Sequence, residues 1–321
     1  MRILVTGASG FVGSTACVYL QSLGHEVIRF LGPTRALAAA SFPVDVADLG
    51  TFPNPELTFP LDAIIHCAGI AHRFGGVSMD DFDRVNVRGV ENTIKFAEQS
   101  EVQKLVLLSS VLVYGTPRDP TPICEDYPAA PDDDYGASKL KGEQVAIKMC
   151  QERSIQLTIL RPAPILGEGS RGNVARLIKA IDRRRFVWIG DGRNRRSFVY
   201  VGDVARAIEH VIRINDNVGP SVYNIVGGSI SVADLVGSVE RSLERRQSKL
   251  AIPSWAAKAI YHLSAVGSPI ERIQRYRRLL ATWLADAVYS GDRIERELGF
   301  TAQTTIEEAL DREVEHYLRN K

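Results

Sequence analysis

Residues 6–13 read Thr6-Gly7-Ala8-Ser9-Gly10-Phe11-Val12-Gly13, and they join an apolar run at 2–6 to a segment with helical spacing at 12–23. Glycines at this spacing allow a tight turn, a close approach of backbone to a pyrophosphate and close packing of the following helix. The N-terminus of that helix offers unpaired N–H groups to an anion. The sequence therefore predicts a dinucleotide site in this turn. The residues expected to hold the dinucleotide are Gly7, Ser9, Gly10, Phe11, Val12 and Gly13.

Apolar runs and helical segments alternate from this turn to about residue 160. Strands are expected at 26–31, 61–68, 104–110 and 156–160, and helices at 81–100 and 135–152. Because the strands contain few polar positions, helices should cover both faces, which predicts an α/β fold with a doubly wound parallel sheet of the Rossmann type. The dinucleotide-binding domain is expected to comprise 1–165 and about 195–222. A smaller, mainly helical substrate-binding domain is expected from about 166–194 and 223–321.

Composition and charge exclude several classes of protein. The chain has 321 residues with 39 Lys+Arg against 38 Asp+Glu, so its net charge of +1 gives no overall field for binding nucleic acid. No apolar run reaches the roughly 18 residues of a membrane-spanning helix. The four cysteines show no metal-binding spacing and are expected to be buried thiols of a reducing compartment. Since the chain opens on a strand rather than a secretory leader, we expect a cytoplasmic protein. From the cysteine spacing we expect no metal site.

A tyrosine and a lysine are predicted to share one face of the helix that starts near residue 135. Tyr135 and Lys139 are four residues apart, about one helical turn. A lysine ammonium and a cationic nicotinamide ring both favour the phenolate and should lower the tyrosine pKa, so that Tyr135 can accept a hydroxyl proton. Ser110 follows a buried strand, where its hydroxyl can hydrogen-bond a substrate oxygen or simply cap the strand end.

These features together resemble the extended short-chain dehydrogenases/reductases, in particular the nucleotide-sugar epimerase/dehydratase group. The resemblance covers nearly the whole chain. Its matched segments are TGASGFVG at 6–13, DVADL at 45–49, HCAG at 66–69, NVRGVENT at 86–93, SSVLVYG at 109–115, YGASK at 135–139, RPAPILGEG at 161–169, RRSFVYVGDVA at 195–205, YNIVGG at 223–228 and RIERELGF at 293–300.

The resemblance implies an enzyme whose catalytic residues are Ser110, Tyr135 and Lys139, with Ser109 as the alternative serine. The further cofactor contacts that it implies are Asp45, Val46, Cys67, Ala68, Gly69, Asn86, Ser109, Tyr135, Lys139 and Pro162. For Asn86, support of the active-site helix and a helix cap both stay open. The substrate contacts are Ser110, Tyr135, Asn173, Arg196 and Arg278, of which the arginines can clamp a diphosphate.

Two departures from the group narrow the reaction and the cofactor. Dehydratases of the group carry Asp-Glu after the catalytic residue, whereas this chain has Val111 and Leu112, which cannot move protons. The expected reaction is therefore at carbon 4 of a UDP-linked sugar, as a 4-epimerase or a reductase of the 4-keto sugar. Leu31 stands where NAD-preferring relatives have an acidic residue, and Arg35, or else Arg29, can meet a 2′-phosphate. This favours NADP over NAD.

Two other functions and the oligomeric state remain to be tested. The fold also suits an NADPH-dependent reductase of an unrelated small ketone or aldehyde. A non-catalytic, cofactor-binding regulator is a further alternative, although the intact set of Ser110, Tyr135 and Lys139 argues against it. The resemblance implies a homodimer formed through the helices at about 81–99 and 135–152.

Overall fold

The computed structural model describes residues 1–32, 41–53, 60–71, 78–117, 121–214, 219–245, 251–252 and 286–321. Arg35 and Arg278, two of the predicted contacts, lie outside these residues. Seven parallel strands form the large sheet in the order β10-β6-β5-β4-β1-β2-β3, which confirms the predicted fold class. They are β1 (Arg2–Thr6), β2 (Glu26–Leu31), β3 (Ser41–Pro43), β4 (Ala63–His66), β5 (Lys104–Leu108), β6 (Gln156–Pro162) and β10 (Ser221–Ile225).

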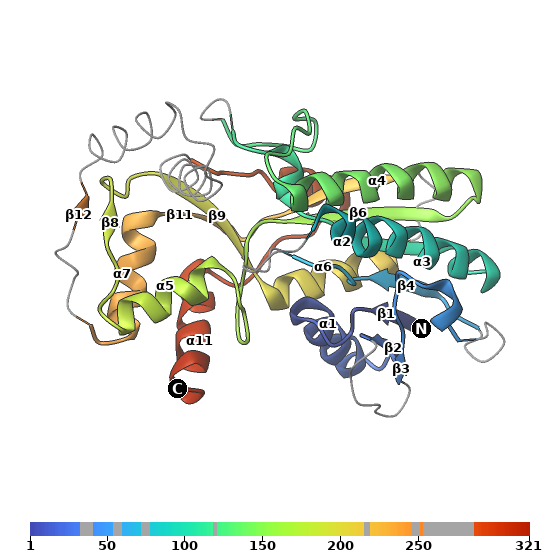
Figure 1. Cartoon of the computed structure of the whole chain (residues 1–321), viewed down its shortest axis with the longest axis horizontal. Helices are drawn as coiled ribbons and strands as arrows, with labels where there is room; N and C mark the ends of the chain where they lie inside the picture. Colours follow the sequence, from blue (N-terminus) through green and yellow to red (C-terminus); the bar gives the residue numbers. More distant parts are fainter. Residues whose placement is uncertain are drawn as a thin grey trace.

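Helices cover both faces of this sheet, as the apolar strands require (Figure 1). On one side α1 (Phe11–Ser22) and α6 (Val201–Arg213) pack together, and on the other α3 (Arg88–Gln99) lies beside α4 (Asp134–Glu152). A separate cluster of buried apolar side chains fills each side. The strand order reverses between β1 and β4, so the crevice for a ligand is expected where these two strands end.

The helix expected at 81–100 is divided, which corrects the prediction. It comprises α2 (Met79–Phe82), a π-helical turn at Asp83–Val87 and α3. A π-turn adds one residue to the turn and shifts the helical register by about 100°. The spacing of apolar residues predicted a helix here but did not reveal this insertion.

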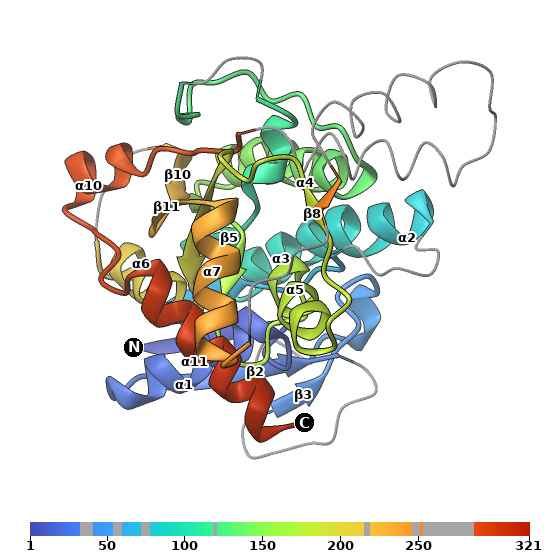
Figure 2. The ribbon, with the colours of Figure 1, turned by 90° about the vertical axis from the view of Figure 1, so that its left-hand side faces the viewer.

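A smaller lobe lies beyond the end of the large sheet. Its three-stranded sheet contains β7 (Ile165–Leu166), β9 (Arg195–Tyr200) and β11 (Gly228–Ser231), and β8 (Trp188–Ile189) pairs with β12 (Ala251–Ile252). Figure 2 shows α5 (Asn173–Asp182), α7 (Val232–Ser242) and α11 (Ile306–Arg319) gathered in this lobe. Helix α10 (Asp292–Leu298) and short 3₁₀ turns at Leu49–Thr51 and Val111–Tyr114 complete the described elements.

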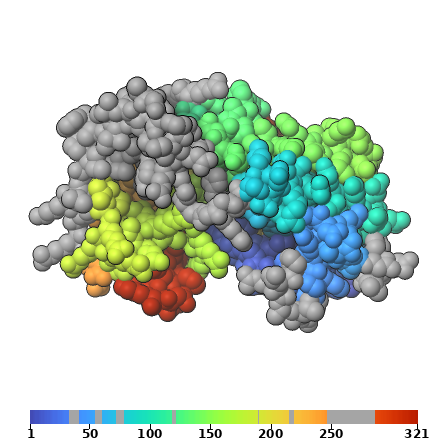
Figure 3. Space-filling view, in the orientation of Figure 1, coloured from blue at the N-terminus to red at the C-terminus, as the bar shows by residue number. Residues whose placement is uncertain are grey.

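The surface is hollowed between the smaller lobe and the N-terminal half of the chain, and residues near the N-terminus are visible in the hollow (Figure 3). Within the described residues, no helix is long and apolar enough to cross a membrane. The cysteines differ in exposure, contrary to the expectation that all are buried. Cys17 and Cys150 are buried, whereas Cys67 is half-buried and Cys124 is exposed, because it lies in an irregular segment outside the sheet.

Candidate active site

The glycine turn after β1 packs against the turn that follows β4. Gly7 has a φ of +65°, and a Cβ at this position would lie 2.6 Å from the Ala68 nitrogen. A Cβ on Gly13 would lie 2.2 Å from the Gly7 carbonyl oxygen. Gly10 precedes α1 and provides no side-chain cap. The turn therefore leaves the first amides of α1 to an outside acceptor, and the cradle fits the diphosphate of a dinucleotide.

Helix α4 presents Tyr135 and Lys139 at the carboxyl end of β5. The helix begins where the Asp133 carboxylate accepts a hydrogen bond of 2.7 Å from the Gly136 N–H. Lys139 Nζ donates to the Leu108 carbonyl over 2.8 Å, at the last residue of β5. The Ser110 and Tyr135 side chains are hydrogen-bonded to each other. The structure thus brings the three predicted catalytic residues together.

Ser110 has a second role as a cap. Its Oγ accepts a hydrogen bond of 3.2 Å from the Leu112 N–H at the start of the 3₁₀ turn. Of the two apolar residues that follow it, Val111 is buried in a small core cluster and Leu112 is 38% exposed. Of the two interpretations weighed from the sequence, the cap is observed, and the hydrogen bond to a substrate oxygen stays a prediction. The same hydroxyl caps the turn and contacts Tyr135.

Burial controls the protonation of the catalytic pair. It raises the pKa of Tyr135 to about 12, with the hydrogen bond from Ser110 acting in the opposite direction and the Asp133 charge adding to the rise. Burial lowers the pKa of Lys139 to about 8, while nearby Cys67 and Glu143 favour its charged form. The pKa expected from the sequence is lower because it includes the charge of a bound nicotinamide ring as well as that of the lysine. In the chain alone, desolvation is the largest effect on Tyr135.

Asn86 connects the loop after β4 to the active-site helix. Its side chain accepts a hydrogen bond of 2.9 Å from the Ile70 N–H, donates one of 3.0 Å to the Ile70 carbonyl and donates one of 2.9 Å to Ser138 Oγ. Asn86 lies in the π-turn and makes no cap there. Of the two roles left open by the sequence, the contacts match support of α4.

The loop after β4 also passes close to Lys139. A Cβ on Gly69 would lie 3.2 Å from Lys139 Nζ and 3.1 Å from Asn86 Oδ1. Ala68 is buried and donates its N–H to Thr6 Oγ1 over 3.3 Å. These contacts place the predicted cofactor residues 67–69 between the glycine turn and the catalytic lysine.

The other predicted cofactor residues differ in how far the protein itself engages them. Asp45 accepts from the Ala47 N–H at 3.0 Å and pairs with Arg84 at 3.1 Å, and Val46 is buried. Pro162 is the buried last residue of β6. Ser109 Oγ is buried without a hydrogen-bond partner among the described residues. A cofactor contact through Asp45 would therefore have to share a carboxylate already engaged twice.

A buried histidine lies below the cofactor turn. His66 Nδ1 is 3.0 Å from both Thr6 Oγ1 and Thr93 Oγ1. Thr93 also donates to the Gly89 carbonyl at 2.8 Å, so the ring is held in a buried network of threonine hydroxyls. Burial lowers the pKa of His66 to about 3, so the ring is neutral at neutral pH.

The predicted substrate contacts that the structure describes lie in the smaller lobe. Asn173 is the exposed first residue of α5, after a Gly172 that provides no side-chain cap. Arg196 is half-buried on β9, and burial lowers its pKa against the opposing effects of Tyr289 and Asp286. Both positions suit a diphosphate: the start of α5 at Asn173 offers helix amides, and Arg196 offers a positive charge.

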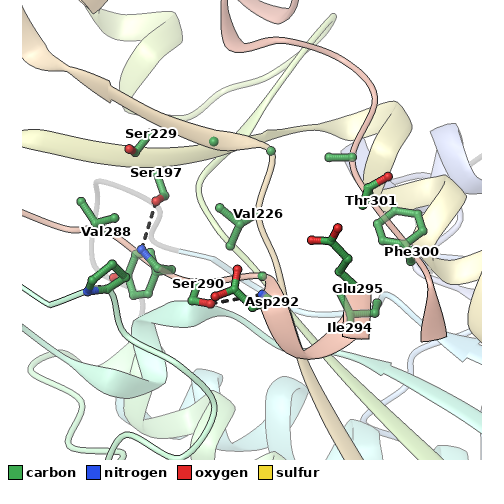
Figure 4. Close-up of a pocket in the computed structure, with 16 residues that line it drawn as sticks. Ser197, Val226, Ser229, Val288, Ser290, Asp292, Ile294, Glu295, Phe300 and Thr301 are labelled. Carbon is green, nitrogen blue, oxygen red and sulfur yellow. Dashed lines mark hydrogen bonds between the residues drawn. The ribbon is translucent and has the colours of Figure 1, made fainter. Parts of the chain in front are cut away.

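A pocket of about 370 Å³ lies apart from these residues. It is formed by β9, β11, the loop after β10 and the segment 288–302. In Figure 4 the Glu295 carboxylate points into it, and the Tyr289 amide donates to Ser197 Oγ over 3.0 Å. None of the predicted site residues lines it, so we do not assign it to the candidate site.

The sequence interpretation missed one buried ion pair directly behind the site. Glu143 lies one turn beyond Lys139 on α4, and its carboxylate is held by the Arg161 guanidinium at the end of β6. A signal was present, since Tyr135, Lys139 and Glu143 recur at four-residue intervals. An acidic residue on the buried face of a helix requires a charged partner.

Comparison with known proteins identifies related chains over the full length. Residues 3–226 match the sequence profile described as NAD dependent epimerase/dehydratase family. The chain is 29% identical to N-acetyl-alpha-D-glucosaminyl-diphospho-ditrans,octacis-undecaprenol 4-epimerase of Escherichia coli O157:H7, over 98% of this chain and 95% of the relative. It is 24% identical to the UDP-glucose 4-epimerase of Vibrio cholerae, over 99% of this chain and 95% of the relative.

A solved structure shares the fold from end to end. MoeE5, in complex with UDP-glucuronic acid and NAD, superposes with a TM-score of 0.78 at 24% sequence identity, covering 100% of both chains. At this identity the likeness establishes the common architecture alone.

Proposed function

Because the chain belongs to the NAD dependent epimerase/dehydratase family, as its sequence motifs predicted, we propose that it acts at carbon 4 of a sugar joined to UDP through a diphosphate, with epimerisation as the net reaction. The names of the two 4-epimerase relatives favour epimerisation over reduction, and one observation of the site argues against dehydration. Lys139, Tyr135 and Ser110 meet at the end of β5, and the two residues after Ser110 are apolar. Dehydration needs a further acid and base there, and Val111 and Leu112 supply neither.

In this proposal the residues divide the work as follows. Tyr135 takes the proton of the carbon-4 hydroxyl and later returns it, and Ser110 hydrogen-bonds the same oxygen. Lys139 binds the ribose next to the nicotinamide and favours the phenolate. The nicotinamide ring supplies the hydride chemistry when it is bound. The residues present fit such a cofactor, because the turn around Gly10 leaves helix amides for its diphosphate and Ser109 Oγ is buried without a partner among the described residues.

The carrier of the sugar is open to a direct test. The Vibrio cholerae relative is named for a UDP-sugar, and the Escherichia coli relative for a sugar on diphospho-undecaprenol. Both substrates present a diphosphate. We propose that three residues bind it, namely Asn173 at the start of α5, Arg196 on β9 and Arg278. We propose UDP as the carrier, and the assay below includes the lipid-linked alternative.

The choice between NADP and NAD depends on the end of β2. Leu31 is only 9% exposed and cannot accept hydrogen bonds from ribose hydroxyls. Arg29 is directed toward α1, where it donates to Gln21 at 2.6 Å. This leaves Arg35 as the proposed partner of a 2′-phosphate and NADP as the proposed cofactor. Arg35→Ala should then weaken NADPH binding by about 10- to 150-fold and spare NADH, whereas wild-type protein that prefers NADH would contradict the assignment.

The decisive experiment is a substrate screen. Purified protein is incubated with UDP-glucose, UDP-N-acetylglucosamine, their 4-keto derivatives and undecaprenyl-diphospho-N-acetylglucosamine, each with NAD and with NADP. Products are separated and nicotinamide absorbance is followed. Epimer formation without net absorbance change supports the proposal. Net oxidation of NADPH by a 4-keto sugar would replace it with a reductase. Failure to bind UDP in calorimetry would favour a reductase of unrelated ketones.

Two further features stay predictions. We expect a homodimer formed through α3 and α4, and light scattering that gives a single species near the monomer mass of 35.3 kDa would contradict it. A cytoplasmic location is expected and can be checked by fractionation of cells that express the chain.

A further inference from the structure

We propose that Glu143, Arg161 and Tyr114 are positioning residues, which fix Ser110 against Tyr135 without touching the substrate. This inference rests on the proposed function, because it assigns a role toward the same pair of catalytic hydroxyls. It concerns a set of buried polar side chains to which the sequence analysis assigns no role.

The contacts run in an unbroken series between the two catalytic elements. Arg161 Nε and Nη2 donate to the two carboxylate oxygens of Glu143 at 2.9 and 2.5 Å, a bidentate ion pair. Arg161 Nη1 donates to the Tyr114 hydroxyl at 2.9 Å. That hydroxyl donates to Asn224 Oδ1 on β10 at 2.8 Å. Each of the four residues is at most 7% exposed.

Glu143 and Tyr114 belong to the two elements that carry the catalytic hydroxyls. Glu143 lies two turns beyond Tyr135 on the same face of α4. Tyr114 is the last residue of the 3₁₀ turn that Ser110 caps. A displacement of Tyr114 would therefore move the Ser110 turn, and a displacement of Glu143 would move the helix that carries Tyr135 and Lys139. The guanidinium between them fixes one element relative to the other.

Stability alone is a weak explanation for this arrangement. Desolvation of two charges offsets most of their attraction, and apolar residues of similar volume often replace a buried ion pair without loss of stability. A bidentate pair does supply geometric specificity, because the guanidinium and the carboxylate meet in one orientation. Positioning is therefore the contribution that an apolar pair of the same size would not reproduce.

The first test removes one oxygen atom. Tyr114→Phe keeps the ring, which stacks on Tyr289 at 6.2 Å between centroids, and deletes the hydroxyl that joins Arg161 to Asn224. The matched control is Tyr317→Phe on α11 in the smaller lobe. It deletes a hydroxyl that donates to the Asp182 carboxylate of α5 at 3.0 Å. With the better of UDP-glucose and UDP-N-acetylglucosamine, Tyr114→Phe should lower kcat by about 10- to 100-fold with KM unchanged within about twofold. Tyr317→Phe should leave kcat unchanged.

The second test separates positioning from stability. Glu143→Gln leaves Arg161 charged and buried without its counterion, so this variant should lose both stability and rate. The double variant Glu143→Leu with Arg161→Met removes both charges. It should regain most of the melting temperature of wild type while kcat stays at least about tenfold low. A double variant that regains kcat together with stability overturns the proposal, as does a Tyr114→Phe protein with wild-type kcat.

Amide hydrogen exchange tests the network independently of turnover. Tyr114→Phe should speed exchange in segments 108–115 and 134–143 relative to Tyr317→Phe. Equal exchange in the two variants overturns the positioning role. If the wild-type protein converts none of the sugar diphosphates in the screen, the proposed function fails, and the exchange comparison still decides whether this network holds the two segments together.

Discussion

Asn86 Nδ2 donates a hydrogen bond to Ser138 Oγ over 2.9 Å, although 52 positions separate the two residues in the chain. Ser138 directly precedes Lys139 on α4, and the same amide group donates to the Ile70 carbonyl in the loop after β4. One buried side chain therefore sets the spacing between the loop that borders the cofactor crevice and the helix that carries the acid/base pair.

Replacing Asn86 should cost more than replacing its buried neighbour Asn92. Asn86→Ala leaves Ile70 and Ser138 without three hydrogen bonds, for an expected loss of about 2–3 kcal/mol in the free energy of unfolding. Asn92→Ala removes one bond, to the Val46 carbonyl at 3.0 Å, and should cost about 1 kcal/mol. Urea denaturation of both variants measures the difference, and equal losses would show that the Asn86 contacts add nothing.

Tyr135→Phe should abolish proton transfer and spare cofactor binding. The loss of an acid/base group is expected to lower kcat by about 10²–10⁴. The Tyr135 hydroxyl is hydrogen-bonded to Ser110, and the half-buried ring is retained in the variant. Steady-state kinetics and a cofactor titration check this pair of outcomes. Turnover close to wild type would remove Tyr135 from the mechanism.

Lys139→Met should impair both catalysis and cofactor affinity, since one ammonium serves both. Lys141→Met is the matched control, because Lys141 is more than half exposed and pairs with Asp83 away from the site. A cofactor dissociation constant that rises about tenfold or more in the first variant and stays constant in the second is the expected result. An unchanged constant in Lys139→Met would refute the dual role.

Gly13→Ala should destabilise the whole N-terminal turn. The added Cβ would lie 2.2 Å from the Gly7 carbonyl oxygen, so backbone has to move, at a cost of about 3 kcal/mol or more. Gly219→Ala adds a methyl group with nothing within 4 Å and should change stability by less than about 0.5 kcal/mol. Thermal unfolding of both variants measures the difference. A Gly13→Ala protein with the melting temperature of wild type would contradict the prediction.

Glu313 should make stability fall as the pH rises. Burial raises the pKa of this carboxyl from its ordinary value of 4.5 to about 7, although the Gly167 N–H donates to it at 3.0 Å. Between these values the unfolded chain binds fewer protons than the folded chain, so the free energy of unfolding decreases from about pH 4.5 to about pH 7 and then levels off.

Glu313→Gln cannot ionise and should therefore be more stable than wild type by about 3 kcal/mol at pH 8, with little difference at pH 4. Glu315→Gln, an exposed position on the same helix, should follow wild type at both pH values. Denaturant titrations at the two pH values measure the effect. A constant difference between Glu313→Gln and wild type across this range would contradict the assignment.

The sequence predicted those features of the fold and the site that depend on a few neighbouring residues. The glycine turn at 6–13, the alternation of strands and helices, and the four-residue spacing of Tyr135 and Lys139 each depend on short-range geometry. The parallel sheet and the family followed from them. Short elements such as β11, which reads Gly-Ser-Ile-Ser, gave no such signal, because a strand of this length forms only through pairing with β9.

Tertiary structure decided how distant residues complete the site. The π-turn that holds Asn86, the series from Glu143 through Arg161 to Tyr114, and the high pKa of Tyr135 all depend on burial and on partners far away in the chain. The sequence by itself determined which chemical groups are available and which short turns present them. Their spacing, solvation and protonation arise only when the sheet brings its strand ends together, since desolvation and long-range hydrogen bonds exist only in the packed chain.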